Sequence, residues 1–588
     1  METDSDLKRT QYCGDLRLEH EGKDVVLKGW VDRRRDLGKL IFIDLRDRTG
    51  KCQVVFNPEK DAELHKKAEK LRGEFVIAVV GKIVKRVQAN ATISTGEIEV
   101  VVSDLRILNE AETPPIAINE DGGESEEIRL KYRFLDLRRP AMQKNIMFRA
   151  AVMQETRQLL SKMGFIEIET PILMKSTPEG ARDFLVPSRV NKGKFYALPQ
   201  SPQTYKQLLM VSGFDKYFQI AKCFRDEDLR ADRQPEFTQI DIEMSFPTPQ
   251  VIYDTFGKFV ADLFKHTIGV DVGKIPSMSY YDAMNIYGSD KPDTRFGMEM
   301  HTVSLLFAKT EFKVFRSVVE SGGAIKAINA PACGDLTRKV VDQLTEVVVA
   351  SGAKGLVWGK VNDQGLEGPS AKFFAPETIS ALVQNLNAKP GDMVFMVAAD
   401  TTVANKALGA LRLEIAKRKE MAKKDQFSLL WVTEFPLFEY SETDKRWSPM
   451  HHPFTAPLEE DISLLYSPEY YLARARAYDL VLNGNEIGGG SIRIHSAGLQ
   501  SKVFELLGIS EAEAQRKFGF LLNAFKYGAP PHGGLAFGLD RLVMIMLGLD
   551  SIRDVIPFPK TTTAQSLMDD CPSTVDAGQL KELGIRLE

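Results

Sequence analysis

Two neighbouring segments place many charged side chains on what should be one face of a β-sheet. Strands are predicted over 219–227 and 237–243, where a period of two sends alternate residues to the same side. The residues on this side are Arg225, Glu227, Gln239, Asp241 and Glu243. A face this polar is costly to bury without partners. It is either a solvated surface of paired charges or the wall of a cleft, and the apolar flanking residues favour a cleft.

A second segment, 533–546, combines glycines with an apolar helix. The glycines predict a strand packed closely on its neighbour, and Arg541 follows near the start of the helix. A helix N-terminus attracts phosphate through its free N–H groups and its dipole. The sequence contains neither G-x-x-x-x-G-K-[ST] nor a plausible G-x-G-x-x-G unit between a strand and a helix. If ATP binds, it is therefore expected to bind on an antiparallel sheet.

The 588 residues are too many for one hydrophobic core, because domains usually stop growing near ~250 residues. Short β-rich runs alternate with turns from Val25 to Leu108, with one helical insert over 61–70. Five strands and one helix suit a small closed barrel of the oligonucleotide-binding (OB) type. A proline-containing and then acidic stretch, 112–127, predicts a linker or hinge.

Beyond Pro140 the pattern changes to a long amphipathic helix, Phe148 to Met163, closed by Gly164. The middle of the chain is predicted to be an α+β insertion within a catalytic domain. The predicted fold is thus multidomain α+β. Its parts are an OB-fold domain (1–110), a hinge (111–140), a catalytic antiparallel-sheet domain in two parts (141–288 and 427–560), the insertion (289–426) and a C-terminal extension (561–588).

Cellular location and partners are constrained only weakly by composition. The acidic N-terminus lacks a signal sequence, and no apolar run approaches the ~20 residues that span a bilayer. The five scattered cysteines suit reduced thiols, so a cytoplasmic location is expected. A net charge of −4 does not point to nucleic acid, and any RNA binding must rest on local patches.

Three segments resemble the ordered motifs of class II aminoacyl-tRNA synthetases. Phe224 to Glu227 resembles their motif 2, Gly534 to Arg541 resembles motif 3, and 164–171 resembles motif 1, which implies a homodimer. Four runs, spread over the whole chain, resemble the bacterial-type aspartyl-tRNA synthetases: Gly29 to Asp36, Phe224 to Asp241, Met450 to Thr455 and Gly488 to Ile494. The insertion resembles a domain that this family shares with a tRNA-dependent amidotransferase subunit.

The resemblance implies activation of L-aspartate with ATP and Mg²⁺, followed by transfer to the 3′ end of tRNA(Asp), without a membrane partner. Arg225 would bridge the ATP α-phosphate and the aspartate α-carboxylate, where negative charge accumulates in the transition state. Arg541 would pair with the terminal phosphates, and these two arginines are the predicted catalytic residues. The remaining predicted nucleotide contacts are Asp226, Glu227, Gln234, Glu486, Gly538, Leu539 and Asp540.

The predicted aspartate site draws on several segments. Ser201 and Pro202 are typical of a helix start, so that Gln203 and Lys206 share a helix face. The resemblance places these residues at the substrate and Lys206 near its side-chain carboxylate. Arg493 carries selectivity, because its fork of N–H donors matches a planar carboxylate. The resemblance adds the following aspartate contacts: Glu179, Ser201, Arg225, Asp241 and His452.

A hairpin is predicted around Asn483 and Gly484, so that Glu486 opposes Val481 and Asp479 is its diagonal neighbour. Two carboxylates there suit Mg²⁺, which also takes oxygens from substrate phosphates. Strict alternation puts Arg493 on the opposite face from Glu486, and a bulge within 488–490 would bring the two residues together. Zinc is not expected, because no third ligand stands at a fitting distance from the two adjacent histidines at 451–452.

In the barrel, Phe42 and Gln53 match positions at which the family binds anticodon bases by stacking and hydrogen bonding. Glu99 is a similar match. Three consecutive arginines, Arg33, Arg34 and Arg35, form a predicted basic patch for phosphates. Pattern alone leaves open whether Phe42 is a base platform or a plain core aromatic.

Two alternatives remain open. Leu37 resembles family members that charge only the aspartate tRNA, whereas relatives that also charge tRNA(Asn) tend to carry histidine there. The other alternative is a non-catalytic tRNA-binding paralogue. Loss of Arg225 or Arg541 would have suggested it, and both are present.

Overall fold

The computed structural model describes residues 3–119, 122–177, 181–229, 233–443 and 445–587. The chain divides into two compact units, residues 1–147 with 556–573, and residues 148–555 with 574–588. Within the described ranges, no helix combines the length and the apolar character needed to cross a membrane.

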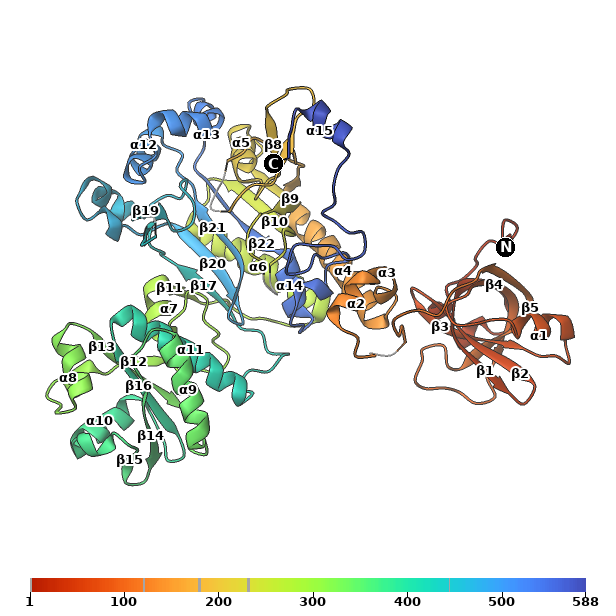
Figure 1. The fold of residues 1–588 in the computed structure, drawn as a ribbon, viewed down its shortest axis with the longest axis horizontal. Coiled ribbons are helices and arrows are strands. Elements are labelled where there is room, and N and C mark those ends of the chain that lie inside the picture. Colours follow the sequence, from red (N-terminus) through yellow and green to blue (C-terminus); the bar gives the residue numbers. More distant parts are fainter. Residues whose placement is uncertain (1–2, 120–121, 178–180, 230–232, 444, 588) are drawn as a thin grey trace. The chain divides into compact units, whose positions relative to one another are not determined.

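The first unit contains a closed five-stranded barrel, as predicted (Figure 1). Its strands pair in the order β1-β2-β3-β5-β4 around a core of mostly aliphatic side chains with two phenylalanines, Phe56 and Phe75. The bounds are β1 Asp24–Leu37, β2 Leu40–Asp47, β3 Gly50–Phe56, α1 Ala62–Ala68, β4 Val76–Lys85 and β5 Ile98–Asn109. The predicted helical insert is α1, and the strands are mostly longer than their apolar runs because pairing continues into polar residues.

The predicted linker is partly helical. It contains α2 (Glu126–Lys131), which is capped by the Ser125 side chain, and α3 (Arg133–Asp136). The next helix, α4 (Pro140–Lys162), begins at Pro140 rather than at Phe148. Proline suits the first position of a helix, because its missing N–H has no partner to lose there. Gly164 then takes a left-handed conformation with φ +84° just beyond the helix, as its predicted role requires.

An eight-stranded sheet forms the centre of the second unit, in the order β11-β17-β20-β21-β22-β10-β9-β6. All pairs are antiparallel except the two at the edges, β11 with β17 and β6 with β9. The bounds are β6 Ile166–Glu167, β9 Lys216–Phe224, β10 Glu236–Ser245, β11 Ser277–Ser279, β17 Leu429–Thr433, β20 Ala477–Leu482, β21 Asn485–Ile492 and β22 His532–Gly538.

One face of this sheet is apolar and is covered by the long helix α6 (Pro249–Ile268). Its aromatic residues meet side chains from three strands, as in the contact of Phe259 with Phe537 and of Tyr253 with Trp431 and Tyr478. Because successive residues alternate between faces, the polar residues of β10 point away from α6. The opposite face is therefore left for a site.

The predicted insertion lies in sequence between β11 and β17, which are neighbours in the central sheet. It has its own five-stranded sheet, β12-β13-β16-β14-β15, with helices packed against it. The bounds are α7 Tyr280–Tyr287, β12 Met300–Thr302, α8 Lys313–Glu320, β13 Ala324–Ala330, α9 Arg338–Ala350, β14 Val357–Asn362, β15 Gly365–Glu367, α10 Pro376–Asn385, β16 Met393–Ala399 and α11 Thr401–Arg418.

The remaining elements of the second unit are short hairpins and helices around the central sheet. They are β7 Leu185–Pro187, β8 Phe195–Ala197, α5 Gln203–Val211, β18 Phe438–Ser441, β19 Arg446–Pro449, α12 Ala497–Leu506, α13 Glu511–Phe525, α14 Leu539–Met546 and α15 Ala577–Leu583. Helix α14 follows β22 directly, as the predicted strand-to-helix segment requires.

Candidate active site

The polar face predicted from alternation exists on β10. Gln239, Asp241 and Glu243 stand opposite Ala221, Gln219 and Tyr217 of β9, and opposite small residues of β22. The predicted strand through Glu227 is wrong, because β9 ends at Phe224. Beyond that point the Asp226 N–H bonds to the carbonyl of Arg182, outside the ladder with β10. Arg225 and Glu227 therefore reach the site from a loop.

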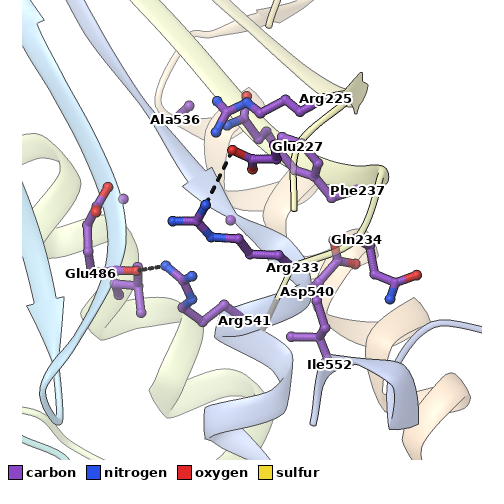
Figure 2. A pocket seen from close by; sticks show the side chains of 14 residues that line it. Arg225, Glu227, Arg233, Gln234, Phe237, Glu486, Ala536, Asp540, Arg541 and Ile552 are labelled. Carbon is purple, nitrogen blue, oxygen red and sulfur yellow. Dashed lines mark hydrogen bonds and ion pairs between the residues drawn. The ribbon is translucent and has the colours of Figure 1, made fainter. Parts of the chain in front are cut away.

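A pocket of about 260 Å³ lies against this end of the sheet (Figure 2). Of the predicted nucleotide residues, those that line it are Arg225, Glu227, Gln234, Glu486, Gly538, Asp540 and Arg541. Asp226 is exposed and Leu539 is buried, and neither lines the pocket. Arg233, Phe237 and Gln239 also line it.

Three arginines line the pocket, together with three carboxylates. The guanidinium of Arg225 lies over the Phe237 ring, 5.0 Å from its centroid. Arg233 pairs with Glu227 at 3.3 Å, and Arg541 donates to the main-chain carbonyl of Glu486 at 2.7 Å (Figure 2). Guanidinium groups at the mouth of a pocket favour a polyphosphate ligand.

The glycines of the strand before α14 have the packing role predicted from the sequence. A Cβ on Gly534 would collide with the Ile242 carbonyl of β10, and one on Gly490 would collide with the Gly534 carbonyl. Only glycine lets these three strands lie so close.

Beyond the pocket, four charged side chains are buried together. Lys206 donates to Asp241 at 2.7 Å and lies 3.3 Å from Glu243. Arg493 donates through Nε and Nη2 to the two oxygens of Glu243, at 3.1 and 3.3 Å, and through Nη1 to Ser491. The four charges balance in number, and Glu243 links the two cations.

The pKa directions follow from this arrangement. Burial raises the pKa of Asp241, with Lys206 offsetting part of the effect. Burial acts the same way on Glu243, but Arg493 and Lys206 outweigh it and hold the pKa of that carboxyl low. Burial would lower the pKa of Arg493, yet the charge of Glu243 raises it. Glu243 is thus held ionised between two cations.

Several polar atoms here have no hydrogen-bond partner among the described residues. They include one oxygen of Asp241, the amide nitrogen of Gln203 and Nε of Arg225. An acceptor and two donors without partners suit a small polar ligand that carries both an ammonium and a carboxylate.

The neighbouring predicted contacts have mixed outcomes. Helix α5 begins at Gln203 with Pro202 at its N-cap, and the Ser201 side chain caps nothing, so the predicted serine cap is wrong. Gln203 and Lys206 do share a buried face. His452 accepts the Phe454 N–H at 3.2 Å. Glu179 lies outside the described residues.

The predicted carboxylate pair is on the hairpin. Asn483 and Gly484 form the turn with φ of +51° and +77°, and Glu486 pairs with Val481 as predicted. The register then shifts, so that Leu480 pairs with Gly488 and Ile487 is the extra residue. This bulge precedes the glycine run instead of lying within it. It reverses the alternation, which puts Arg493 on the same face as Glu486.

Gly489 lies directly beneath the two carboxylates. A Cβ there would be 2.5 Å from Oδ1 of Asp479 and 3.2 Å from Oε1 of Glu486. The negative charge of Asp479, helped by burial, raises the pKa of Glu486 to about 7. Burial would lower the pKa of His451, but Asp479, 3.5 Å from its Nε2, raises it.

These two carboxylates fit Mg²⁺. The cation suits hard oxygen ligands and commonly takes one or two carboxylates together with phosphate and water. Oδ1 of Asp479 has no hydrogen-bond partner among the described residues. Among the residues that the structure describes, no group of three or more His, Cys, Asp or Glu side chains could hold a metal ion.

Comparison with known proteins agrees with this geometry. A family model described as tRNA synthetases class II (D, K and N) matches residues 125–562, and an OB-fold nucleic acid binding domain model matches residues 25–108. An "Aspartate--tRNA(Asp/Asn) ligase" of Desulfatibacillum aliphaticivorans is 55% identical, over 99% of this chain and 98% of its own. An "Aspartate--tRNA ligase" of Bacillus licheniformis is 54% identical, over 99% of each chain. The chain belongs to the aspartate–tRNA ligase family of class II tRNA synthetases.

Solved structures of this class share the fold at low identity. An asparaginyl-tRNA synthetase from Pyrococcus horikoshii, complexed with asparaginyl-adenylate, matches with a TM-score of 0.59 at 19% identity, over 94% of this chain and 98% of that one. A putative aspartyl-tRNA synthetase from Leishmania major matches with a TM-score of 0.58 at 19% identity, over 95% and 92%. The OB barrel, the antiparallel catalytic sheet and the mixed α+β fold are those of class II synthetases.

The predicted anticodon-binding residues lie in the barrel. Phe42 is half-buried while Ile41 and Ile43 lie in the core, so Phe42 is on the outer face and is not a core aromatic. The same face holds Gln53, whose amide donates to Glu99 at 2.7 Å. Arg35 donates to Asp44 at 2.6 Å and to Gln53 at 3.3 Å.

The three consecutive arginines do not form one patch. Arg34 points to the other side of β1, where it pairs with Asp36 and donates to the Glu69 carbonyl. Alternation along a strand makes this division unavoidable, so Arg34 is separated from Arg35, and phosphate binding by these arginines stays a prediction. Arg33 is exposed.

Four residues without a predicted role also lie in these two places, the site on the central sheet and the barrel. Arg233 and Glu243 stand in the charged stretch and on the polar strand already singled out, where charge alone could have drawn attention to them. His451 lies beside the predicted carboxylates. Arg86 donates to Gln53 and lies 3.8 Å from Glu99, a position that only the closed barrel reveals.

Proposed function

We propose that this chain joins L-aspartate to ATP, forming aspartyl-adenylate and pyrophosphate, and then transfers aspartate to the 3′ end of tRNA(Asp). The observation that carries the proposal is that the pocket and the buried charged group share one face of the central sheet. An arginine-lined pocket lies at one end of it and the buried group of Lys206, Asp241, Glu243 and Arg493 at the other. Family membership supports the same reaction.

In the proposed first step, the aspartate α-carboxylate attacks the α-phosphorus and the bond to pyrophosphate breaks. Arg225 stabilises the charge that accumulates between the two anions, since its guanidinium lines the pocket, over the Phe237 ring. Arg541 and Glu227 hold the nucleotide, and Gln234 borders the same pocket. Asp540 contributes its main chain only, because its carboxylate is engaged by Thr238 and Arg149.

Selectivity for aspartate over asparagine is assigned to Arg493 with Lys206. Two cations close to the substrate side chain favour a carboxylate, and an amide would put N–H donors against them. The hydrogen bonds of Glu243 orient the guanidinium of Arg493. Asp241 has one oxygen without a hydrogen-bond partner among the described residues, and we assign it to the substrate ammonium.

Mg²⁺ is the cofactor that we assign to Asp479 and Glu486. When bound, it would neutralise phosphate charge. The two residues would hold it on the side of the pocket where Arg541 meets the Glu486 carbonyl.

For the tRNA, we assign anticodon binding to the outer barrel face around Phe42, Gln53, Glu99 and Arg35. A half-buried aromatic on the outer face, beside hydrogen-bonding groups, suits unstacked bases. Charging of tRNA(Asn) as well is a second candidate, supported by relatives named for both tRNA species, such as that of Geotalea uraniireducens. Leu37 supports the narrower scope. Charging assays with each purified tRNA decide between them.

We also propose a homodimer working in the cytoplasm. Ile166, in the segment that resembles motif 1, is about half exposed, and so are Ile172 and Leu173, which directly follow that segment. Exposed apolar side chains in the edge strand β6 and in the chain that follows it suit burial against a second copy. Sedimentation equilibrium tests the dimer.

The decisive experiment is exchange of labelled pyrophosphate into ATP, with aspartate, asparagine or lysine supplied in turn. Exchange with aspartate alone is expected. Exchange with asparagine or lysine but not with aspartate would contradict the assignment, and tRNA binding without any charging would favour a non-catalytic paralogue.

A further inference from the structure

A buried cluster behind the nucleotide pocket joins three elements that are distant in sequence. Asp540 is the second residue of α14, and its carboxylate accepts the Thr238 N–H of β10 at 2.8 Å. The other carboxylate oxygen accepts from Nη1 of Arg149 on α4. Arg149 also donates to the Thr238 hydroxyl at 3.1 Å and to the Val555 carbonyl at 3.3 Å. All three side chains are buried.

The geometry of the sheet explains why a carboxylate is needed there. The ladder between β10 and β22 reaches Gln239 opposite Gly538, where β22 turns into α14. The next N–H of β10, that of Thr238, then has no strand carbonyl to meet, and Asp540 supplies the acceptor. A buried carboxylate needs a cation as well, and Arg149 provides one: its Nη1 donates to Asp540 while its Nη2 donates to the Thr238 hydroxyl.

This cluster fixes the first turn of α14. Gly538, at the N-cap, has no side chain to cap the helix, so Asp540 is the side chain that anchors this turn to the sheet. Arg541 is the next residue, and its guanidinium reaches into the pocket to the Glu486 carbonyl. Thr238 likewise stands between Phe237 and Gln239, which both line the pocket.

We infer that Arg149 is a positioning residue for ATP binding, acting through Asp540 on Arg541. Arg149 does not itself line the pocket; its hydrogen bonds go to Asp540, Thr238 and Val555, and of these three only Asp540 is among the described lining residues. It holds Arg541 at the phosphates by fixing the helix start. The inference rests on the phosphate-binding role proposed for Arg541.

The test compares ATP and aspartate dissociation constants, measured by titration calorimetry on the full chain with Mg²⁺ present. Arg149→Lys keeps the charge but loses the fork, and we expect the Kd for ATP to rise about tenfold or more with the Kd for aspartate unchanged. In an Arg541→Ala background the same substitution should add no further loss, because a residue that acts through Arg541 has nothing left to position. Arg157→Lys, on the exposed side of α4, is the matched control and should leave both constants unchanged.

Thr238→Val removes only the hydroxyl acceptor of Arg149 and keeps the Asp540 contact, so it supplies a second measurement if Arg149→Lys folds poorly. A smaller rise in the Kd for ATP is expected. Equal losses for ATP and aspartate, or full additivity with Arg541→Ala, would overturn the role of Arg149. If Arg541→Ala itself leaves ATP binding unchanged, the proposed role of Arg541 fails and this inference fails with it.

Discussion

Gly489→Ala is the sharpest test of the carboxylate pair, because the change adds one methyl group beneath it. The new Cβ would lie 2.5 Å from Oδ1 of Asp479. Non-bonded carbon and oxygen atoms approach to about 3.3 Å, so the carboxylate must move by about 0.8 Å. The φ of Gly489 is not positive, so the backbone itself accepts alanine.

A misplacement of about 1 Å at a reacting centre costs about 10²-fold in rate, which corresponds to about 2.7 kcal/mol of transition-state stabilisation. We therefore expect kcat/KM for MgATP in pyrophosphate exchange to fall about 100-fold, with a higher Mg²⁺ requirement. The KM for aspartate should change little, because Arg493 and Lys206 are not displaced.

The assay is aspartate-dependent exchange measured over a series of Mg²⁺ concentrations. Gly498→Ala is the matched control, since a Cβ at Gly498 in α12 meets nothing within 4 Å. Exchange by Gly489→Ala within about threefold of the parent, with an unchanged Mg²⁺ requirement, would refute the placement of the metal.

Three further predictions follow from the same geometry. Arg493→Lys should raise the KM for aspartate about 100-fold and erase most discrimination against asparagine, because one ammonium cannot replace the fork held by Glu243. The KM for ATP should stay within about threefold. Exchange assays that show equal losses for aspartate and for ATP would contradict this role of Arg493. Glu486 has a pKa of about 7 against an ordinary value of 4.5, so the folded chain binds the proton of this carboxyl more tightly than the unfolded chain does. Without metal, Glu486 therefore makes the free energy of unfolding fall as the pH rises from about 4.5 to about 7. Urea unfolding at pH 5.5 and 7.5 should show that Glu486→Gln removes this part of the decline; an unchanged decline would rule out the repulsion by Asp479. Phe42→Ala should raise the KM for tRNA about tenfold or more and leave pyrophosphate exchange intact, and a loss of exchange would mean that Phe42 serves the fold instead of the RNA.

The sequence by itself determined the local features. Alternation placed Asp241 and Glu243 on the polar face of a strand, and the Asn-Gly turn set Glu486 opposite Val481. Both are short-range consequences of backbone geometry, a period of two in one case and a turn that needs positive φ in the other. The barrel strands and the strand-to-helix step before Arg541 were predictable for the same reason.

Only the tertiary structure decided which residue forms the bulge. Three consecutive glycines offer no local preference, and the extra residue is Ile487 because β21 must keep register with β20 on one side and β22 on the other. That single residue puts Arg493 and Glu486 on one face. Similarly, β9 stops at Phe224 because the following loop bonds to Arg182, which no pattern in the strand itself could indicate.

The charge pairs were also beyond the reach of the sequence. Arg493 meets Glu243 across 250 positions, and Arg149 meets Asp540 across 391. Each of these residues looks like an ordinary charged residue in its own segment. Its role depends on being buried beside an oppositely charged partner from another helix or strand, and the local sequence does not indicate that partner. The sequence therefore determined which side chains face the site, and the packing of distant strands and helices decided how they are held there.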